Sequence, residues 1–308
     1  MGRKKSGLPI HGWIIIDKPL GVTSTQTVGR IRQLTNAAKV GHAGTLDPLA
    51  TGLLPIALGE ATKTISIVMD GQKSYRFTIC FGEERTTDDA EGEVSARSDM
   101  RPSDADIEAV LSQFTGEIEQ VPPIYSAIKI DGKRAYDLAR ANEEVEMKSR
   151  IVRIDSIHLA ERPDADHASF DVTCGKGAYM RALARDIARA LGSAGYVSAL
   201  RRTAVGGFTI EDAIPLEKLE ELDHIPAASE HLLPVKTALD DIPALALTDE
   251  EARRMRCGQA VSWLKVAGRS NLGPIGPDVV CCAITGDLPV ALARVEDGNV
   301  LPVRVLNL

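Results

Sequence analysis

Residues 41–54, GHAGTLDPLATGLL, contain a single acidic side chain, Asp47, which follows two glycines and directly precedes a proline. Pro48 biases Asp47 toward extended backbone angles, and Gly41 and Gly44 allow the main chain to approach another body closely. The stretch therefore predicts a loop that presents one carboxylate at a defined angle, which suits a nucleophile or a general base. The alternative, from local chemistry alone, is an ordinary Asp-Pro turn.

A second candidate residue lies in the segment GAYMRALARDIARALG, residues 177–192. Its apolar residues recur at helical spacing and Gly192 is placed to end the helix. Arg181 lies at the border of the apolar face, one position and therefore about 100° from Met180, whereas Arg185 and Arg189 are expected further toward solvent. Because a partly buried guanidinium needs an acidic partner, the pattern predicts an ion pair for Arg181, either structural or within a site.

The sequence lacks the motifs of several other catalytic classes. It has no G-x-x-x-x-G-K-[ST] loop, no G-x-S-x-G elbow, no H-E-x-x-H pair and no G-x-G-x-x-G after a strand. His42 and Asp47 together are too few ligands for a metal ion. The sequence therefore gives no support for nucleoside triphosphate use, and we expect no catalytic metal.

Cysteine usage and hydropathy constrain the compartment. The five cysteines are odd in number and show no C-x-x-C spacing, which argues against a disulfide framework and favours a reducing compartment. No apolar run approaches the roughly 18 residues that a membrane-spanning helix requires. We expect a soluble, cytoplasmic protein without a membrane partner.

The net charge of −7 hides a strong asymmetry along the chain. Residues 1–46 hold seven lysines and arginines against one acid, and residues 174–202 hold six against one. Residues 211–251 hold twelve acids. If the two basic segments meet in space, they predict a nucleic-acid groove on an acidic protein; the alternative is that each is a solvated surface.

The elements that must position these residues follow from periodicity and capping signals. A buried strand is expected at 13–16, and a helix begins after Thr23, which has capping-box spacing with Gln26. KSYRFTICF, residues 73–81, alternates as a half-buried strand, and the acidic stretch EERTTDDAEGE that follows is expected to be a surface loop. A capped helix is predicted from Ser103, and further strands at 151–159 and 169–174.

The length of 308 residues favours two domains. We predict a catalytic domain over residues 1–243. Residues 244–308 carry short apolar runs divided by Gly, Asp and Pro and predict a small β-rich domain. Within the first domain, residues 125–150 mix basic and acidic side chains and are expected to form a mobile excursion.

Several stretches, taken in order, resemble the TruB-type tRNA pseudouridine-55 synthases. They span about residues 11–208 and comprise IDKP, GHAGTLDPLATGLLPIALGEATK, KSYRFTICFG, VPPIYSAIKIDGKRAYDLAR, GKGAYMRALARDI and LRRTAVGGF. The resemblance implies an α+β pseudouridine synthase fold, with a mixed, largely antiparallel sheet flanked by helices and a PUA-like C-terminal domain. It also implies an enzyme that isomerises a T-loop uridine of tRNA without a cofactor or an obligatory protein partner. Residues 244–308 match the PUA pattern only weakly.

The resemblance assigns roles to individual residues. It makes Asp47 the catalytic nucleophile, with Arg181 as the partner that keeps the carboxylate ionised and fixed in direction. Tyr75 matches the tyrosine that stacks on the flipped base, although its periodicity alone indicates a core residue. The remaining matches are RNA-binding or pocket positions: His42, Lys18, Pro19, Tyr179, Leu200 and the RNA-clamping insertion at about 125–150.

Two alternatives share these sequence features. One is the catalytic subunit of a guide-RNA pseudouridylation particle, which needs guide RNA and helper proteins. The other is an RNA-binding or RNA-folding protein whose active site is idle.

Overall fold

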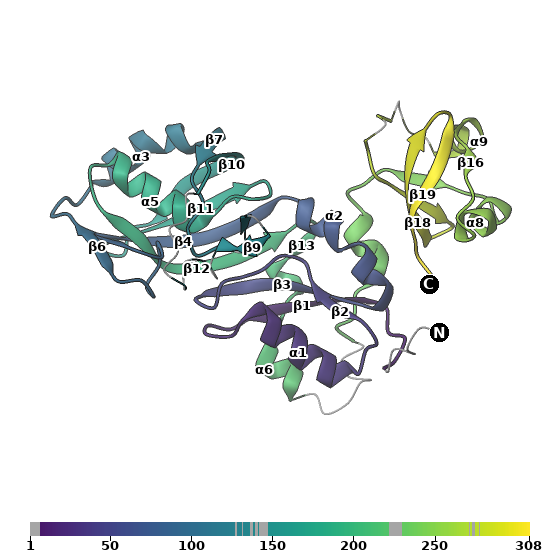
Figure 1. Ribbon diagram of the computed structural model, residues 1–308, viewed down its shortest axis with the longest axis horizontal. Helices are drawn as coiled ribbons and strands as arrows, with labels where there is room; N and C mark the ends of the chain where they lie inside the picture. The colour runs from purple at the N-terminus through teal and green to yellow at the C-terminus, as the bar shows by residue number, and fades with distance from the viewer. Residues whose placement is uncertain are drawn as a thin grey trace. The chain divides into compact units, whose positions relative to one another are not determined.

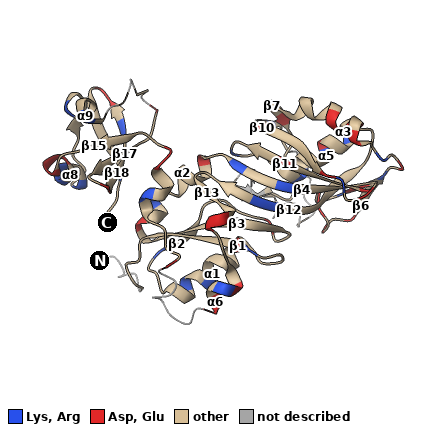
Figure 2. Cartoon of the chain, turned by 180° about the vertical axis from the view of Figure 1, so that it is seen from behind, with Lys and Arg blue, Asp and Glu red and all other residues tan. Residues whose placement is uncertain are grey.

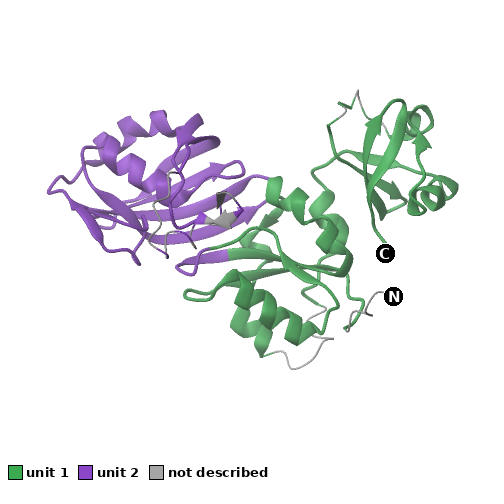
Figure 3. Cartoon of the chain, viewed as in Figure 1, with its two compact units in different colours: residues 1–46, 53–70, 206–308 green, residues 47–52, 71–205 purple. Residues whose placement is uncertain are grey.

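The computed structural model describes residues 7–126, 128–130, 132–135, 138, 141, 147–221, 230–270, 272, 275–276 and 278–308. The predicted excursion at 125–150 therefore lies partly outside the described residues. The chain forms two compact units (Figure 3): unit 1 comprises residues 1–46, 53–70 and 206–308, and unit 2 comprises residues 47–52 and 71–205. The domain boundary at 243/244 stays a prediction.

Unit 2 consists of a sheet with helices on one face (Figure 1). Strand β3 (Ala50–Leu58) begins in this unit, and from it the order is β3-β12-β4-β11-β10-β7. The β3–β12 pair is parallel and the other pairs are antiparallel. The remaining elements are β4 (Lys73–Phe81), β5 (Glu83–Arg85), β6 (Val94–Arg97), α3 (Asp104–Leu111), η2 (Ser112–Phe114), β7 (Gly116–Gln120), β8 (Lys129–Ile130), β9 (Lys133–Arg134), β10 (Arg150–Glu161), β11 (His167–Cys174), α5 (Met180–Ala190) and β12 (Gly195–Val205).

The core of unit 2 forms where the sheet meets α3 and α5. The alternation predicted for residues 73–81 is confirmed, because Phe77, Ile79 and Phe81 are buried while Arg76 is exposed. The predicted capping box of α3 is also present: the Ser103 hydroxyl accepts from the Asp106 N–H, and the Asp106 carboxylate accepts from the Ser103 N–H. These sequence signals fix which face of each element packs inward.

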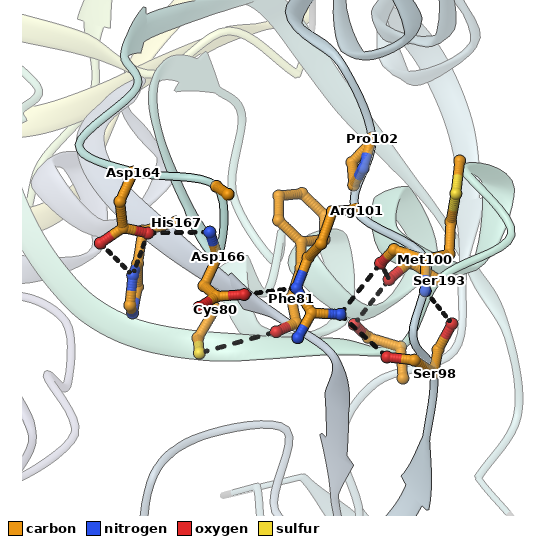
Figure 4. Close-up of polar contacts among 12 residues, drawn as sticks. Cys80, Phe81, Ser98, Met100, Arg101, Pro102, Asp164, Asp166, His167 and Ser193 are labelled. Atoms are coloured by element: carbon orange, nitrogen blue, oxygen red, sulfur yellow. Dashed lines mark hydrogen bonds and ion pairs between the residues drawn. The ribbon is translucent and has the colours of Figure 1, made fainter.

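Arg101 links the segment after β6 to the residue just before β11 (Figure 4). Arg101 donates to the carbonyls of Ser98 and Met100, at 2.9 and 3.2 Å, and is ion-paired with Asp166. Gly82, with φ of +105°, lies under this guanidinium, and a Cβ there would be 2.3 Å from Arg101 Nη2. The backbone angle favours glycine, and a Cβ there would displace the Arg101 guanidinium.

Unit 1 contains two separate sheets. In the first, the order is β14-β1-β3 with β2 paired to β3, and β1 and β14 are parallel. Its elements are β1 (Gly12–Lys18), α1 (Ser24–Thr35), β2 (Val40–His42), η1 (Gly59–Lys63), α2 (Ile65–Asp70), β13 (Phe208–Thr209), η3 (Ile210–Asp212), β14 (Ile214–Pro215), α6 (Leu216–Glu220) and η4 (Val235–Leu239). The capping box predicted for Thr23 and Gln26 begins α1.

The second sheet of unit 1 has five strands in the order β15-β17-β18-β19-β16 and its own apolar core. Its elements are β15 (Ala244–Ala246), α8 (Asp249–Arg256), β16 (Val261–Ser262), α9 (Trp263–Ser270), β17 (Cys281–Thr285), β18 (Leu288–Glu296) and β19 (Asn299–Val305). The β-rich character predicted for residues 244–308 is therefore confirmed. The expected α+β class, with mixed and largely antiparallel pairing, is confirmed as well.

Candidate active site

The loop predicted at 41–54 is shorter than expected, because residues 41–42 belong to β2 and residues 50–54 to β3. The part between them, which carries Asp47, is fixed on both sides. Just before it, the Leu46 N–H donates to Ser24 Oγ at 2.9 Å, and that hydroxyl donates to the Leu46 carbonyl at 3.1 Å. Just after it, the Ala50 N–H donates to the Asp47 carbonyl at 3.0 Å. The Asp47 side chain remains 41% exposed. The loop thus holds its backbone firmly while leaving the carboxylate accessible to a substrate.

The strand that follows approaches β12 too closely for a side chain. Gly52 has φ of +96°, and a Cβ there would lie 2.2 Å from the Arg202 carbonyl oxygen. Ala50, Thr51 and Gly52 pair in parallel with residues 200–202 of β12. This register fixes the position of Asp47 relative to Leu200, a predicted pocket residue.

The predicted acidic partner of Arg181 is present, because its Nε lies 3.0 Å from Asp47 Oδ2. The Arg181 side chain is 7% exposed and its other nitrogens are also bound. Nη1 donates to the Thr87 carbonyl at 2.9 Å and lies 3.4 Å from Asp89 Oδ2, and Nη2 donates to the Tyr125 carbonyl at 2.8 Å. Because acceptors surround the guanidinium, it cannot rotate, and it directs the Asp47 carboxylate by a charge-assisted hydrogen bond.

Two predicted aromatic residues lie near this pair. Tyr75 is half-buried on β4, opposite Arg202 of β12, and burial raises the pKa of its hydroxyl, with the Asp47 charge acting in the same direction. Burial likewise raises the pKa of Tyr179, again with a contribution from Asp47. Both hydroxyls therefore stay protonated at neutral pH.

The backbone of Tyr179 is held by a buried amide. Gln120, which is 1% exposed, accepts from the Tyr179 N–H at 2.8 Å and donates to the Tyr179 carbonyl at 3.2 Å. Tyr179 immediately precedes α5, so this double contact also fixes the start of the helix that carries Arg181.

Three other predicted site residues lie in unit 1. Lys18, at the end of β1, is buried, and its ammonium donates to the carbonyls of Pro19 and Val22 at 2.9 and 2.8 Å. His42 ends β2, is half-buried and pairs with Ile56. Unit 2 thus gathers Asp47, Arg181, Tyr75, Tyr179 and Leu200, and unit 1 holds Lys18, Pro19 and His42.

The acidic side of the site was not predicted from the sequence. The stretch 83–93 was expected to be a surface loop, but Asp88 and Asp89 are only 6% and 7% exposed. Arg185 was expected toward solvent, but it is buried and its Nη1 lies 2.9 Å from Asp88 Oδ2. Both expectations were wrong for one reason: Asp89 and Asp88 neutralise Arg181 and Arg185 of α5, so these four charges can be buried together. The signal in the sequence was two consecutive acids matched by two arginines one helical turn apart.

Burial raises the pKa of Asp88 to about 6, and the nearby Glu84 acts in the same direction, while Arg185 and Arg181 oppose the shift. Desolvation of the carboxylate thus outweighs the attraction of the two cations.

The same pairing changes the expected distribution of exposed charge. Lysines and arginines of β4 and β12 form visible blue segments (Figure 2). In α5, however, Arg181, Arg185 and Arg189 are all ion-paired with acids, the last with Glu84. The excess charge counted over residues 174–202 is therefore not a freely exposed basic surface.

The part of the chain that the structure describes contains no group of three or more His, Cys, Asp or Glu side chains placed to hold a metal ion. Within the same residues, no helix is long and apolar enough to cross a membrane.

Comparisons with known proteins identify the family. Residues 32–180 match the N-terminal domain model of the TruB family pseudouridylate synthases, and residues 181–240 match the tRNA pseudouridylate synthase B C-terminal domain. The chain is 54% identical over 308 residues to tRNA pseudouridine synthase B of Rhodospirillum rubrum, and 53% identical over 309 residues to that of a Caulobacter strain. Each alignment covers 100% of both chains.

Among solved structures, a Cbf5-Nop10-Gar1 complex contains a chain that superposes with a TM-score of 0.74 at 26% identity, covering 96% of this chain and 83% of that one. A chain of an archaeal box H/ACA Nop10-Cbf5 complex superposes with a TM-score of 0.73 at 23% identity, covering 99% and 92%, which shows a shared fold. With family models matching most of the sequence and relatives of this identity matching all of it, the chain belongs to the TruB family of pseudouridylate synthases.

Proposed function

We propose that this enzyme isomerises the T-loop uridine at position 55 of tRNA to pseudouridine, with Asp47 as the catalytic nucleophile. Family membership gives the reaction class, and relatives at 53–54% identity carry names that specify tRNA. The observation that carries the proposal to this chain is the 3.0 Å ion pair between Asp47 and Arg181. It joins the two residues that the motifs assign to the reaction.

The chemistry needs a positioned carboxylate and no cofactor. The bond between ribose C1′ and uracil N1 breaks, and a bond between C1′ and C5 forms. The hydrogen on C5 is lost as a proton and N1 gains one, so substrate and product are isomers. A carboxylate that bonds covalently to the sugar or to the base splits this hard step into two easier ones. Arg181 contributes by fixing the direction of the Asp47 carboxylate.

The remaining site residues are proposed to bind the flipped nucleotide. Tyr75 stacks on the uracil, because stacking on an aromatic ring tolerates the in-plane rotation that the base must undergo. Tyr179 and Leu200 line the pocket, and Lys18 and Pro19 support it. His42 occupies the place that the target base leaves, which offsets part of the few kcal/mol that extrusion costs.

The substrate is proposed to be the T-arm stem-loop of a cytoplasmic tRNA, recognised without a protein partner. The Cbf5-containing structures keep the guide-RNA particle as a rival, but their identity to this chain is 26% or less, against 54% for the synthase B relatives. Conversion of unmodified tRNA by the pure protein, without guide RNA or helper proteins, would exclude that rival.

The test is incubation of the pure protein with an unmodified T-arm stem-loop, followed by pseudouridine mapping at single-nucleotide resolution. We expect modification of the T-loop uridine alone, and no modification by Asp47→Asn with stem-loop affinity retained. Failure of the parent protein to modify the stem-loop and full-length tRNA would refute the proposal. An Asp47→Asn variant that still turns over would remove Asp47 from the mechanism.

A further inference from the structure

A second ion pair lies one helical turn from Arg181. Arg185 binds Asp88 through Nη1 at 2.9 Å, Asp186 through Nε at 2.9 Å and the Val121 carbonyl through Nη2 at 2.9 Å. None of these contacts reaches Asp47. The pair is nevertheless buried, since Asp88 is 6% and Arg185 9% exposed. Burial of the Arg185–Asp88 pair costs desolvation free energy, although the pair does not contact Asp47.

Arg181 and Arg185 of α5 have matching partners. Each binds one carboxylate of the adjacent pair Asp88 and Asp89, and each donates Nη2 to a carbonyl of the segment 121–125. The acids pair with the arginines in reverse order along the chain: Asp89 forms an ion pair with Arg181, and Asp88 forms one with Arg185, one helical turn later. The loop after β5 is thus attached to α5 at two successive points.

The backbone at Asp88 makes this double attachment possible. In extended chain, consecutive side chains point to opposite sides, but Asp88 has φ of +60°, in the left-handed region that non-glycine residues rarely adopt. The conformation is held by hydrogen bonds from the Asp88 N–H to the Arg85 carbonyl at 3.0 Å and from the Val197 N–H to the Asp88 carbonyl at 3.1 Å. The strained residue is therefore anchored to β5, β12 and α5 together.

We propose that Asp88, by binding Arg185, is a positioning residue for Arg181: it sets the loop so that the Thr87 carbonyl and the Asp89 carboxylate hold the guanidinium against Asp47. The inference rests on the proposed function. Without this anchor the loop relaxes, and Arg181 keeps Asp47 and Tyr125 but loses its fixed orientation. Substrate binding does not depend on the anchor, whereas the chemical step does.

The charge state of Asp88 supplies a readout that a purely structural role would not give. Burial raises the pKa of Asp88 to about 6, so the carboxylate gains a proton as the pH falls below that value and its bond to Arg185 weakens. An asparagine at this position resembles the protonated acid. The charged groups around Asp88 are Arg181, Arg185, Arg189 and Asp186 on α5 and Glu84 on β5.

The experiment compares Asp88→Asn with a matched control, Asp186→Asn, which removes the other carboxylate from Arg185 without touching the loop. Single-turnover rates on the T-arm stem-loop are measured from pH 5 to pH 8, with stem-loop affinity alongside. At pH 7.5 we expect Asp88→Asn to be about tenfold slower, the effect of one lost charge-assisted hydrogen bond, with affinity unchanged. The ratio of parent to variant rates should fall toward one as the pH approaches 5. Asp186→Asn should stay within about twofold of the parent.

The proposal is overturned if Asp88→Asn matches the parent at pH 7.5, if the rate ratio is independent of pH, or if Asp186→Asn loses as much as Asp88→Asn. Should Asp88→Asn not fold, Arg185→Lys is judged by the same rate and affinity criteria. A parent protein that does not modify the stem-loop refutes the proposed function, and this outcome is distinct from all of the others.

Discussion

Replacing Arg181 by lysine tests how the guanidinium acts. Arg181 holds Asp47 through Nε, the Thr87 carbonyl through Nη1 and the Tyr125 carbonyl through Nη2, at 3.0, 2.9 and 2.8 Å. A lysine keeps the charge but has one nitrogen, which cannot occupy three places at once. If the lysine ammonium binds the two carbonyls, the Asp47 carboxylate loses its ion-pair partner. If it binds Asp47 instead, at least one of the two carbonyls loses its hydrogen-bond donor.

At least one charge-assisted hydrogen bond is therefore lost, which is worth about 1.5–3 kcal/mol. If that loss falls on the transition state, the rate drops by about 10- to 100-fold. The assay is tritium release from stem-loop RNA labelled at uridine C5, under single-turnover conditions, with affinity measured by filter binding. We expect the rate to fall and the affinity to change by less than about twofold, because the Arg181 side chain is only 7% exposed.

The matched control is Arg189→Lys on the same helix. Arg189 is paired with Glu84 at the surface, with 55% of its side chain exposed, and exposed pairs contribute little. It should keep the parent rate. Parent-like turnover by Arg181→Lys would refute the reasoning, and so would an equal loss in both variants.

Three further outcomes are expected. Gly52→Ala should lower the free energy of unfolding by more than about 2 kcal/mol, since its Cβ would lie 2.2 Å from the Arg202 carbonyl oxygen. The control Gly177→Ala, at a position with φ of +85° and open space around it, should lose only about 1 kcal/mol. Equal urea midpoints for the two variants would contradict this prediction. Gln120→Ala leaves the Tyr179 N–H and carbonyl without their side-chain partner, so it should cost about 1–3 kcal/mol by the same measurement; an unchanged midpoint would count against it. The pKa of Asp88 is about 6 in the fold, against an ordinary value of 3.8. The contribution of this carboxyl to the free energy of unfolding is therefore present at acid pH, and about 3 kcal/mol of it is lost as the pH rises from about 4 to about 6. Asp88→Asn should remove that decline, and parallel curves of stability against pH for variant and parent would disprove it.

Local signals predicted much of the fold. The alternation of residues 73–81, the capping boxes at Thr23 and Ser103 and the amphipathic pattern of 180–191 all depend on residues close in sequence, and each is present. Ordered motifs also led to the family and to Asp47 and Arg181. For the helices and the strand, the residues that carry the signal lie within the element itself or at its start.

The burial of charge could not be predicted in this way. EERTTDDAEGE reads as a solvated loop and Arg185 as a solvated side chain, because a charge in isolation belongs in water. Only a partner from 97 residues away makes burial of Asp88 tolerable, and that partner is invisible to any local pattern.

The sequence by itself thus determined the strand at 73–81, the capped starts of α1 and α3, the helix at 180–190, the family and the acid–arginine pair that the motifs assign to the reaction. The tertiary structure decided what surrounds that pair: the carbonyls of Thr87 and Tyr125, the carboxylate of Asp89 and the second ion pair behind them. The physical reason is that helices and strands follow from neighbouring residues, whereas the environment of a buried charge is set by groups that approach only when the chain has folded.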